Sequence, residues 1–342
     1  MAEKTTAIVM RWGALGDMVM ATPVLRALAN RYGHPCTVVC LGAWAQLLYQ
    51  GLPSVAAVHV LASRKKPYWF SPDQWRLVRI LQPLRGQPTY VMAGDKRAGS
   101  LMRRAGMTIA GSGDAINFVP NEHQVDYQAR IAEFLPGSYN RHPELAVAPE
   151  ELSECRAWLL PLVGDAPVVV VQVGNRRTMG RRVRSNNVKH WPLDRWVSVV
   201  RGVLASAPQI HVLFNGSPGE RTMTEEIVAA VGDPRAHSVA GQVPIRRMLA
   251  LLSLAHSSIS VDTGPAHVAA AVGCPLVVLF GATDPRLNAP LATTAPVQIV
   301  TGPPDAPIFD GDAGWCAHHH MEGITAEAVL VAWHGLNNRE LC

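Results

Sequence analysis

Two aspartates occupy positions from which an α/β protein usually contacts its ligand. Asp17 follows the apolar run Ala7–Met10 and a glycine-containing loop, and Asp262 follows an apolar run that ends at Val261. If both runs are parallel strands, each aspartate lies just past the carboxyl end of its strand, at the edge where ligands bind. Such carboxylates could take part in acid–base chemistry. Asp is also a common helix N-cap residue, so a capping role for Asp17 stays open.

The segment that begins at Ile259 predicts a strand, a tight turn and a helix that together suit a phosphate. An Asp-Thr-Gly turn at 262–264 ends the strand. Pro265 fits the first position of a helix, where its missing N–H costs nothing, and small residues fill the helix expected over 266–272. Backbone N–H groups and the positive end of the helix dipole then point at one place, which favours an anion.

A dense run of positive charge follows the most apolar strand expected in the second half, Val168–Val173. The cations of the loop 174–192 are Arg176, Arg177, Arg181, Arg182, Arg184 and Lys189. Phosphate recognition fits a loop in this position, although a solvated basic loop is the simpler interpretation, and no recognised fold motif supports nucleic-acid binding. Farther on, Glu220 suits either the start of a helix or a hydrogen bond to a sugar hydroxyl.

The composition describes an ordinary globular chain with room for two cores. Its 342 residues are 48% hydrophobic and 17% charged, which suggests two domains. The formal net charge of +5 suggests acidic small molecules or an anionic membrane face. No apolar run approaches the roughly 20 residues that span a membrane, and no signal peptide is expected. The scattered cysteines suggest reduced thiols in a cytoplasm.

The sequence shows no pattern typical of a metal or nicotinamide enzyme. The loop 11–17 lacks the Gly-x-Gly-x-x-Gly fingerprint of dinucleotide sites. The tract 316–320, Cys-Ala-His-His-His, lacks the paired spacing of a structural zinc site. We therefore predict that the protein uses neither a metal ion nor a bound cofactor.

Apolar runs alternate with helical patterns along both halves, which is typical of parallel sheets with crossover helices. A proline-rich stretch, 136–149, connects the halves. Just before it, an amphipathic helix is expected over 123–135, with Val125, Ile131, Phe134 and Leu135 as apolar anchors. Two Rossmann-like halves would place a ligand in the cleft that the carboxyl ends of both sheets face, so we expect Asp17 and Asp262 to face one another.

Several motifs in order resemble glycosyltransferase family 9, the heptosyltransferase-like enzymes of lipopolysaccharide assembly. They are 11–23 (RWGALGDMVMATP), 189–192 (KHWP), 216–220 (GSPGE), 261–267 (VDTGPAH) and 280–285 (FGATDP). The first resembles the family's Arg-x-x-x-x-Gly-Asp-x-x-x-x-x-Pro opening. The chain departs from the family at Gly13 and Ala14, where members often carry a serine, and in the density of its arginine run.

The resemblance implies an α/β fold of the GT-B type, with two Rossmann-like domains whose parallel sheets face each other across a cleft. It predicts an acceptor-binding domain at residues 1–148 and a nucleotide-sugar-binding domain at 149–324. The last segment, 325–342, would be a C-terminal helix that packs back on the N-terminal domain.

The resemblance also assigns roles, in an inverting transfer that needs no metal. Asp17 would be the general base, Lys189 would contact the diphosphate leaving group, and Glu220 would contact the nucleoside or ribose. The other expected contacts are Asp262 to the donor sugar's hydroxyls, Thr263, Gly264 and His267 to the diphosphate, and Arg11, Gly16 and Arg184 to acceptor or phosphate.

The resulting hypothesis is transfer of a heptose or related sugar from an ADP-activated donor to a lipopolysaccharide core or related glycan. The alternatives are a UDP-sugar-dependent GT-B transferase or epimerase, a nicotinamide oxidoreductase, and a non-catalytic nucleotide-sugar-binding protein. The implied partners are the donor and a lipid-linked or anionic acceptor, without nucleic acid. We expect a cytoplasmic protein that can contact the inner membrane. The loop Arg64–Phe70 could touch acceptor or membrane, or be a solvated loop with one buried aromatic.

Overall fold

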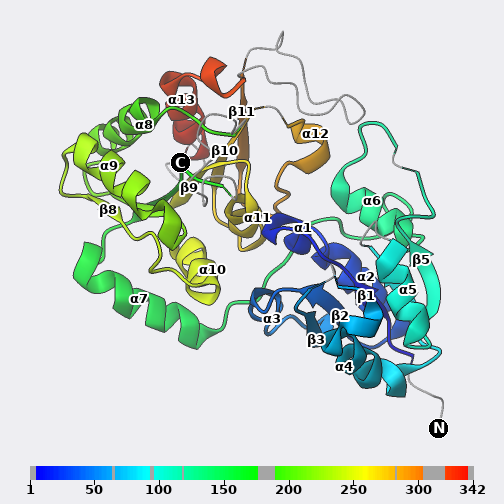
Figure 1. Cartoon of the computed structure of the whole chain (residues 1–342). Coiled ribbons are helices and arrows are strands. Elements are labelled where there is room, and N and C mark those ends of the chain that lie inside the picture. Colours follow the sequence, from blue (N-terminus) through cyan, green and yellow to red (C-terminus); the bar gives the residue numbers. More distant parts are fainter. Residues whose placement is uncertain are drawn as a thin grey trace. The chain divides into compact units, whose positions relative to one another are not determined.

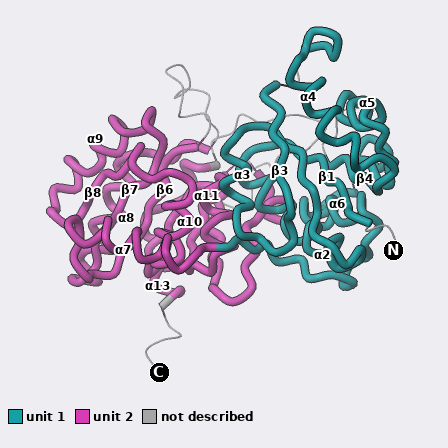
Figure 2. Tube along the Cα trace, turned by 90° about the horizontal axis from the view of Figure 1, so that it is seen from below, with its two compact units in different colours: residues 1–146 teal, residues 147–342 magenta. Residues whose placement is uncertain are grey.

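The chain forms two compact units, each built on its own parallel sheet (Figure 1). The computed structural model describes residues 5–63, 66–92, 96–117, 119–175, 189–281, 283–302 and 320–337. Unit 1 comprises residues 1–146 and unit 2 residues 147–342 (Figure 2). The division therefore falls inside the proline-rich stretch 136–149.

Unit 1 contains a five-stranded sheet with the order β3-β2-β1-β4-β5, in which all neighbours are parallel. The strands are β1 (Ile8–Met10), β2 (Cys36–Leu41), β3 (Val55–Leu61), β4 (Pro88–Val91) and β5 (Thr108–Ser112). In the register of the central strand, Ile8 lies opposite Thr37 and Thr89. Every residue of β1 is buried, as expected for a parallel strand covered on both faces.

Helices cover this sheet. They are α1 (Leu15–Val19), α2 (Thr22–Tyr32), α3 (Trp44–Leu48), α4 (Pro72–Leu81), α5 (Lys96–Arg104) and α6 (Gln124–Ile131), with 3₁₀ turns η1 (Tyr68–Phe70) and η2 (Gln82–Leu84). Leu77 of α4 and Leu101 of α5 pack into one core with Ile8 and Met10 of β1. Helix α2 contacts β2 and α6.

Unit 2 contains a six-stranded parallel sheet with the order β11-β10-β9-β6-β7-β8. The strands are β6 (Val168–Gln172), β7 (His211–Asn215), β8 (Ala236–Ser238), β9 (Ser257–Val261), β10 (Leu276–Phe280) and β11 (Val297–Thr301). In the described part of the chain, β6, β9 and β10 are buried throughout. They form the centre of the sheet, which explains why most of their residues are apolar or small.

The helices of unit 2 pack around its sheet. They are α7 (Pro149–Val163), α8 (Leu193–Ser206), α9 (Arg221–Val231), α10 (Ile245–Leu254), α11 (Gly264–Ala271), α12 (Pro285–Asn288) and α13 (Ala326–Asn337), with η3 (Pro218–Glu220) and η4 (His320–Gly323). Val169 and Val171 of β6 pack with residues of α8, α9 and α13. Helix α10 contacts α7 and α11, and α11 contacts β9 and β10.

The terminal helix is part of unit 2. Within this unit α13 contacts α8, β10 and β11, and packing of the segment 325–342 on the N-terminal domain stays a prediction. Trp333, buried to 1% exposure, explains this position, because its indole N–H donates to Ser257 Oγ at 2.9 Å. The hydroxyl of Thr325 accepts from the N–H of Ala328 at 3.1 Å and caps the start of this helix.

The segment 17–31 contains two helices, because α1 ends at Val19 and α2 begins at Thr22, with Pro23 in its first turn, where a proline is tolerated. The N-cap residue of α2 is Ala21. Strand β8 was not foreseen, since it has three residues and a polar end.

The helix expected over 123–135 is also shorter than predicted. Helix α6 ends at Ile131, and Glu133 has a φ of +58°, which a right-handed helix does not allow. Val125 and Ile131 are buried as expected, whereas Leu135 is 74% exposed.

Among the described residues, no helix is both long and apolar enough to cross a membrane.

Candidate active site

Each sheet has one place where the order of its strands reverses. In unit 1 the chain runs from β1 through β2 to β3 on one side and returns to β4 and β5 on the other. In unit 2 it runs from β6 to β7 and β8, and returns to β9, β10 and β11. Open α/β sheets bind ligands at the carboxyl ends of the strands that flank such a reversal. The expected ligand edges are therefore the ends of β1 and β4 in unit 1, and of β6 and β9 in unit 2.

Arg11 and Asp17 form an ion pair at the reversal point of unit 1. Arg11 follows β1, and its Nη1 donates to the carbonyl oxygen of Met92, directly after β4, at 3.0 Å. Its Nη2 donates to Asp17 Oδ1 at 3.0 Å. The Arg11 side chain is 12% exposed and that of Asp17 34%, so the arginine is fixed in the protein while the carboxylate still meets solvent.

Asp17 does not sit at the N-cap of a helix. It is the third residue of α1, and its Oδ2 accepts from the N–H of Ala14, the N-cap residue, at 2.7 Å. Gly13 makes room for this carboxylate, since a Cβ there would lie 2.5 Å from Asp17 Oδ2. Gly16 is buried inside α1. The loop thus holds Asp17 through two hydrogen bonds and leaves it one-third exposed, an arrangement that suits a base.

A buried tyrosine supports α1 from behind. The hydroxyl of Tyr49 donates to the carbonyl oxygen of Met18 at 2.8 Å. Burial raises the pKa of Tyr49 well above its usual range, so this hydroxyl stays protonated and the hydrogen bond persists across the physiological range.

Asp262 is the centre of a charged cluster at the reversal point of unit 2. It follows β9, and its side chain is 6% exposed. Its Oδ2 accepts a hydrogen bond from Lys189 Nζ and another from Thr283 Oγ1 at 2.7 Å. Lys189 also donates to the carbonyl oxygen of Asp262 at 3.2 Å. Burying a carboxylate is costly unless it is hydrogen-bonded and paired with a cation, so Asp262, Lys189 and Thr283 form one hydrogen-bonded cluster.

Helix α11 begins directly beside this cluster. Thr263 is its N-cap residue, with φ −157° and ψ 170°, and makes no side-chain cap hydrogen bond. Gly264 is the first helical residue, and Pro265 follows it. His267 lies in the first turn and is 5% exposed. The helix dipole therefore points toward the Asp262 edge, where it favours an anion.

Glu220 lies at the same sheet edge, after β7, and is 4% exposed. Its Oε2 accepts from the N–H of Ser217 at 2.7 Å, which stabilises the turn η3. This hydrogen bond explains the burial of the Glu220 carboxylate. Contact of Glu220 with a ribose stays a prediction. Nearby, Asn215 donates to Gln172 Oε1 at 3.0 Å, which joins the ends of β7 and β6.

Two residues of this edge were not predicted from the sequence. Thr283 stands within the quoted FGATDP motif, but only the fold reveals its hydrogen bond to Asp262. Gln172 ends an otherwise apolar strand. A polar residue at the carboxyl end of such a strand could have indicated that it belongs to the site. Arg184, the other arginines of the run 176–184 and the residues 316–319 lie outside the described residues.

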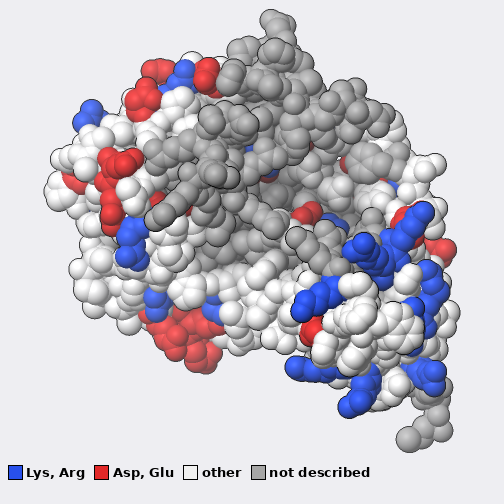
Figure 3. All heavy atoms as spheres, viewed as in Figure 1, with Lys and Arg blue, Asp and Glu red and all other residues white. Residues whose placement is uncertain are grey.

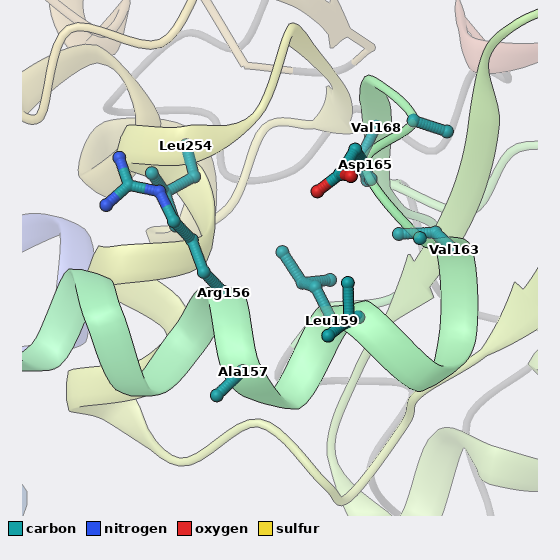
Figure 4. A pocket seen from close by; sticks show the side chains of 10 residues that line it. Arg156, Ala157, Leu159, Val163, Asp165, Val168 and Leu254 are labelled. Carbon is teal, nitrogen blue, oxygen red and sulfur yellow. The ribbon is translucent and has the colours of Figure 1, made fainter.

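A separate depression of about 410 Å³ lies at the opposite edge of the same sheet. Val163, Asp165 and Val168 line it before and at the start of β6, together with Arg156 and Leu159 of α7 (Figure 4). It therefore faces the amino ends of the strands, away from the cluster around Asp262. Within the described residues, no group of three or more His, Cys, Asp or Glu side chains is arranged to hold a metal ion.

Comparison with known proteins identifies the family of this chain. The sequence profile of glycosyltransferase family 9 (heptosyltransferase) matches residues 121–306, more than half of the chain. Lipopolysaccharide heptosyltransferase 2 of Escherichia coli K12 is 30% identical over 345 residues, which cover 92% of this chain and 94% of the relative. The chain belongs to glycosyltransferase family 9. It is thus a glycosyltransferase, as the motifs predicted.

Solved structures support the same fold. E. coli ADP-heptose lipopolysaccharide heptosyltransferase II has a TM-score of 0.76 at 20% identity, with 99% of this chain and 100% of that chain covered. E. coli heptosyltransferase WaaC with ADP has a TM-score of 0.69 at 19% identity, with 97% and 99% covered. The predicted GT-B fold with two parallel sheets is confirmed.

Proposed function

We propose that this glycosyltransferase moves a heptose or closely related sugar from an ADP-activated donor to a lipopolysaccharide core or related glycan acceptor. The observation that carries the proposal is the 30% identity with a lipopolysaccharide heptosyltransferase over nearly the whole chain. Two similar solved structures are named for ADP-heptose or for bound ADP, and they support a donor activated by adenosine diphosphate.

Unit 2 holds the donor in this proposal. The N-terminus of α11, with Thr263 and Gly264, receives the diphosphate, and Lys189 neutralises the charge that grows as the diphosphate leaves. Asp262 binds hydroxyl groups of the sugar, and Thr283 and Lys189 keep its carboxylate in place. His267 and Glu220 contribute to the diphosphate and nucleoside parts of the site.

Unit 1 supplies the base. The acceptor hydroxyl must lose a proton as its oxygen attacks the anomeric carbon, and the exposed carboxylate of Asp17 takes that proton. The C–O bond to the diphosphate breaks as the new glycosidic bond forms, which inverts the configuration. Arg11 orients the Asp17 carboxylate through its hydrogen bond. Arg11, Gly16 and Arg184 are the proposed contacts to the acceptor or its phosphates.

Metal independence is part of the proposal. Lys189 and the dipole of α11 supply the positive charge that a divalent cation would otherwise provide to a leaving diphosphate. Transfer should therefore continue at an unchanged rate after dialysis against EDTA. A loss of activity that is restored by one added metal would contradict this part.

A donor panel tests the proposal. ADP, UDP, ADP-heptose, UDP-glucose and UDP-N-acetylglucosamine are compared by thermal shift, and the binders are then assayed for nucleotide release with lipid-core acceptors. We expect ADP and ADP-heptose to raise the melting temperature, and ADP to be released only when acceptor is present. Preference for UDP compounds would indicate a UDP-sugar transferase or epimerase. Binding without release for any acceptor would indicate a non-catalytic nucleotide-sugar-binding protein.

A further inference from the structure

Unit 1 exposes two large aromatic side chains on a single 3₁₀ turn. In η1, Trp69 is 68% exposed and Phe70 is 76% exposed, although side chains of this size are usually at least half-buried. Their neighbour Tyr68 packs against the core of unit 1. The turn is therefore anchored at one residue and presents the next two to solvent.

The turn is held in place by ordinary hydrogen bonds. Ser71 Oγ accepts from the N–H of Gln74 at 3.4 Å and begins α4. The side chain of Gln74 donates to the carbonyl oxygen of Lys66 at 2.9 Å, which ties the segment before the turn to the helix after it. The exposure of Trp69 and Phe70 is thus a property of a fixed backbone.

Positive charge surrounds this turn. The guanidinium carbon of Arg104, at the end of α5, lies 4.8 Å from the ring centre of Tyr68 and 5.3 Å from that of Trp69. Figure 3 shows Lys and Arg gathered over the part of unit 1 where α4 and α5 lie. The exposed cations of η1, α4, η2 and α5 with their flanks are Lys66, Arg76, Arg79, Arg85, Lys96, Arg97, Arg103 and Arg104.

Little negative charge offsets these cations. Among the described residues from 66 to 104, the one carboxylate is that of Asp73, and it accepts from the backbone N–H of Ala62 at 2.5 Å. Trp75 of α4 is also 44% exposed. We call the surface formed by η1, α4 and α5 the basic aromatic face.

We propose that the basic aromatic face docks unit 1 on the surface of an anionic phospholipid bilayer, with Trp69 and Phe70 inserted at the level of the headgroups. Aromatic rings are favoured at that depth, and each Lys or Arg near an anionic leaflet adds about 1 kcal/mol of attraction. Single-stranded nucleic acid also pairs with aromatic and basic groups, but it needs rings that line a groove along its backbone. Here the two rings project from a turn.

This inference adds a partner to the proposed function and does not depend on the donor or the sugar. The purpose of membrane binding rests on the proposed function, because a membrane-bound enzyme would meet a lipid-linked acceptor at the bilayer surface. Vesicle binding can be measured without either substrate, so the two proposals can fail separately.

The test is co-sedimentation of the full chain with phosphatidylcholine vesicles, with and without phosphatidylglycerol. We expect binding only to the anionic vesicles, weakened by salt. The Trp69→Ser/Phe70→Ser variant should lose most binding, and Arg103→Gln should lose about fivefold, the effect of one cation. The matched control is Leu135→Ser/Val331→Ser, since these residues are 74% and 72% exposed and belong to none of the elements η1, α4 and α5. It should bind like the wild type.

Three results would overturn the proposal. One is wild-type protein that does not bind anionic vesicles, and another is equal binding by the Trp69→Ser/Phe70→Ser variant. The third is tighter binding to single-stranded RNA than to vesicles. Circular dichroism and melting temperature confirm that each variant is folded. Transfer to a deacylated, soluble acceptor should be unchanged in Trp69→Ser/Phe70→Ser, and a loss there would assign the rings to acceptor binding instead.

Discussion

At the residue scale, both halves of the proposed site consist of a carboxylate held by a cation. Arg11 holds Asp17 in unit 1, and Lys189 holds Asp262 in unit 2. The two pairs differ in burial, since the side chain of Asp17 is 34% exposed and that of Asp262 only 6%. The exposed carboxylate suits proton transfer, whereas the buried one suits fixed hydrogen bonds.

Replacing Lys189 tests the donor half. Lys189→Met should weaken ADP binding about ten- to a hundredfold, because a hydrogen bond to a charged group contributes about 1.5–3 kcal/mol. It should also lower the free energy of unfolding, since Asp262 loses its cation. Calorimetric titration with ADP measures the first effect and chemical denaturation the second.

The matched control keeps the charge. Lys189→Arg retains a cation beside Asp262 and should recover much of the stability, although its geometry differs. Unchanged ADP affinity in Lys189→Met would remove this residue from the diphosphate site.

The sequence identified most of these residues but not their contacts. Asp262 and Lys189 were named from separate motifs that lie 73 residues apart, and only the fold brings them together. Thr283 was missed because its hydroxyl acts through a long-range hydrogen bond, which no local pattern encodes. Arg11 was expected to contact acceptor or phosphate, and its two bonds to Asp17 and Met92 show an additional, structural role.

At the element scale, the strands were predictable because parallel strands buried on both faces consist of short apolar runs. The errors in the predicted elements arose where the local sequence pattern did not decide the structure. The periodicity of 123–135 continued past Ile131, but the left-handed Glu133 ended the helix. Among the described strands, β8 pairs with β7 alone and lies at the edge of the sheet, so its three residues need no continuous apolar run.

Close packing between β5 and α6 gives a stability prediction. A Cβ on Gly111 would lie 2.0 Å from the carbonyl oxygen of Ile131, a backbone atom that cannot move away by side-chain rotation. Gly111→Ala should therefore destabilise the protein by about 1–3 kcal/mol. In α5, Gly99→Ala meets only the flexible side chain of Arg103 at 3.5 Å and should be neutral or slightly stabilising. Urea unfolding compares the two, and equal stabilities would refute the packing argument.

Strands β7 and β8 carry a pair of histidines that predicts a pH dependence. Nδ1 of His211 and Nε2 of His237 lie 3.1 Å apart, so at least one ring must be neutral to accept. Burial lowers the pKa of His211, Arg235 lowers it further, and Asp233 opposes both. Burial and the charge of His211 lower the pKa of His237.

Proton uptake by the two histidines determines whether stability rises or falls with pH. Both rings are neutral in the folded and unfolded chains above the unfolded pKa of about 6.5. In that pH range the pair does not lower the free energy of unfolding. As pH falls below that value, the unfolded chain binds more protons than the folded one and stability declines. We expect a lower melting temperature at pH 5 than at pH 7.5, and a smaller difference in His237→Gln. An identical difference in both proteins would show that the pair does not contribute.

At the scale of the whole molecule, the chain consists of two α/β units, each with a parallel sheet. Each unit carries the polar residues of the proposed site where its strand order reverses. This architecture was predictable, because alternating apolar runs and helical patterns leave few topologies and the motif order indicated the family. The exact division at residue 146 could not be predicted, since composition changes gradually along 136–149. That Asp17 and Asp262 serve one reaction stays a prediction.

In the proposed reaction, unit 1 provides the base and unit 2 binds the donor. The most direct test is the rate of ADP release by Asp17→Asn at saturating ADP-heptose and lipid-core acceptor, with ADP affinity measured alongside. Asn keeps the shape of the side chain but cannot take up a proton. We predict a rate about 10²- to 10⁴-fold below wild type with unchanged ADP affinity. A rate close to that of the wild-type protein would contradict the claim.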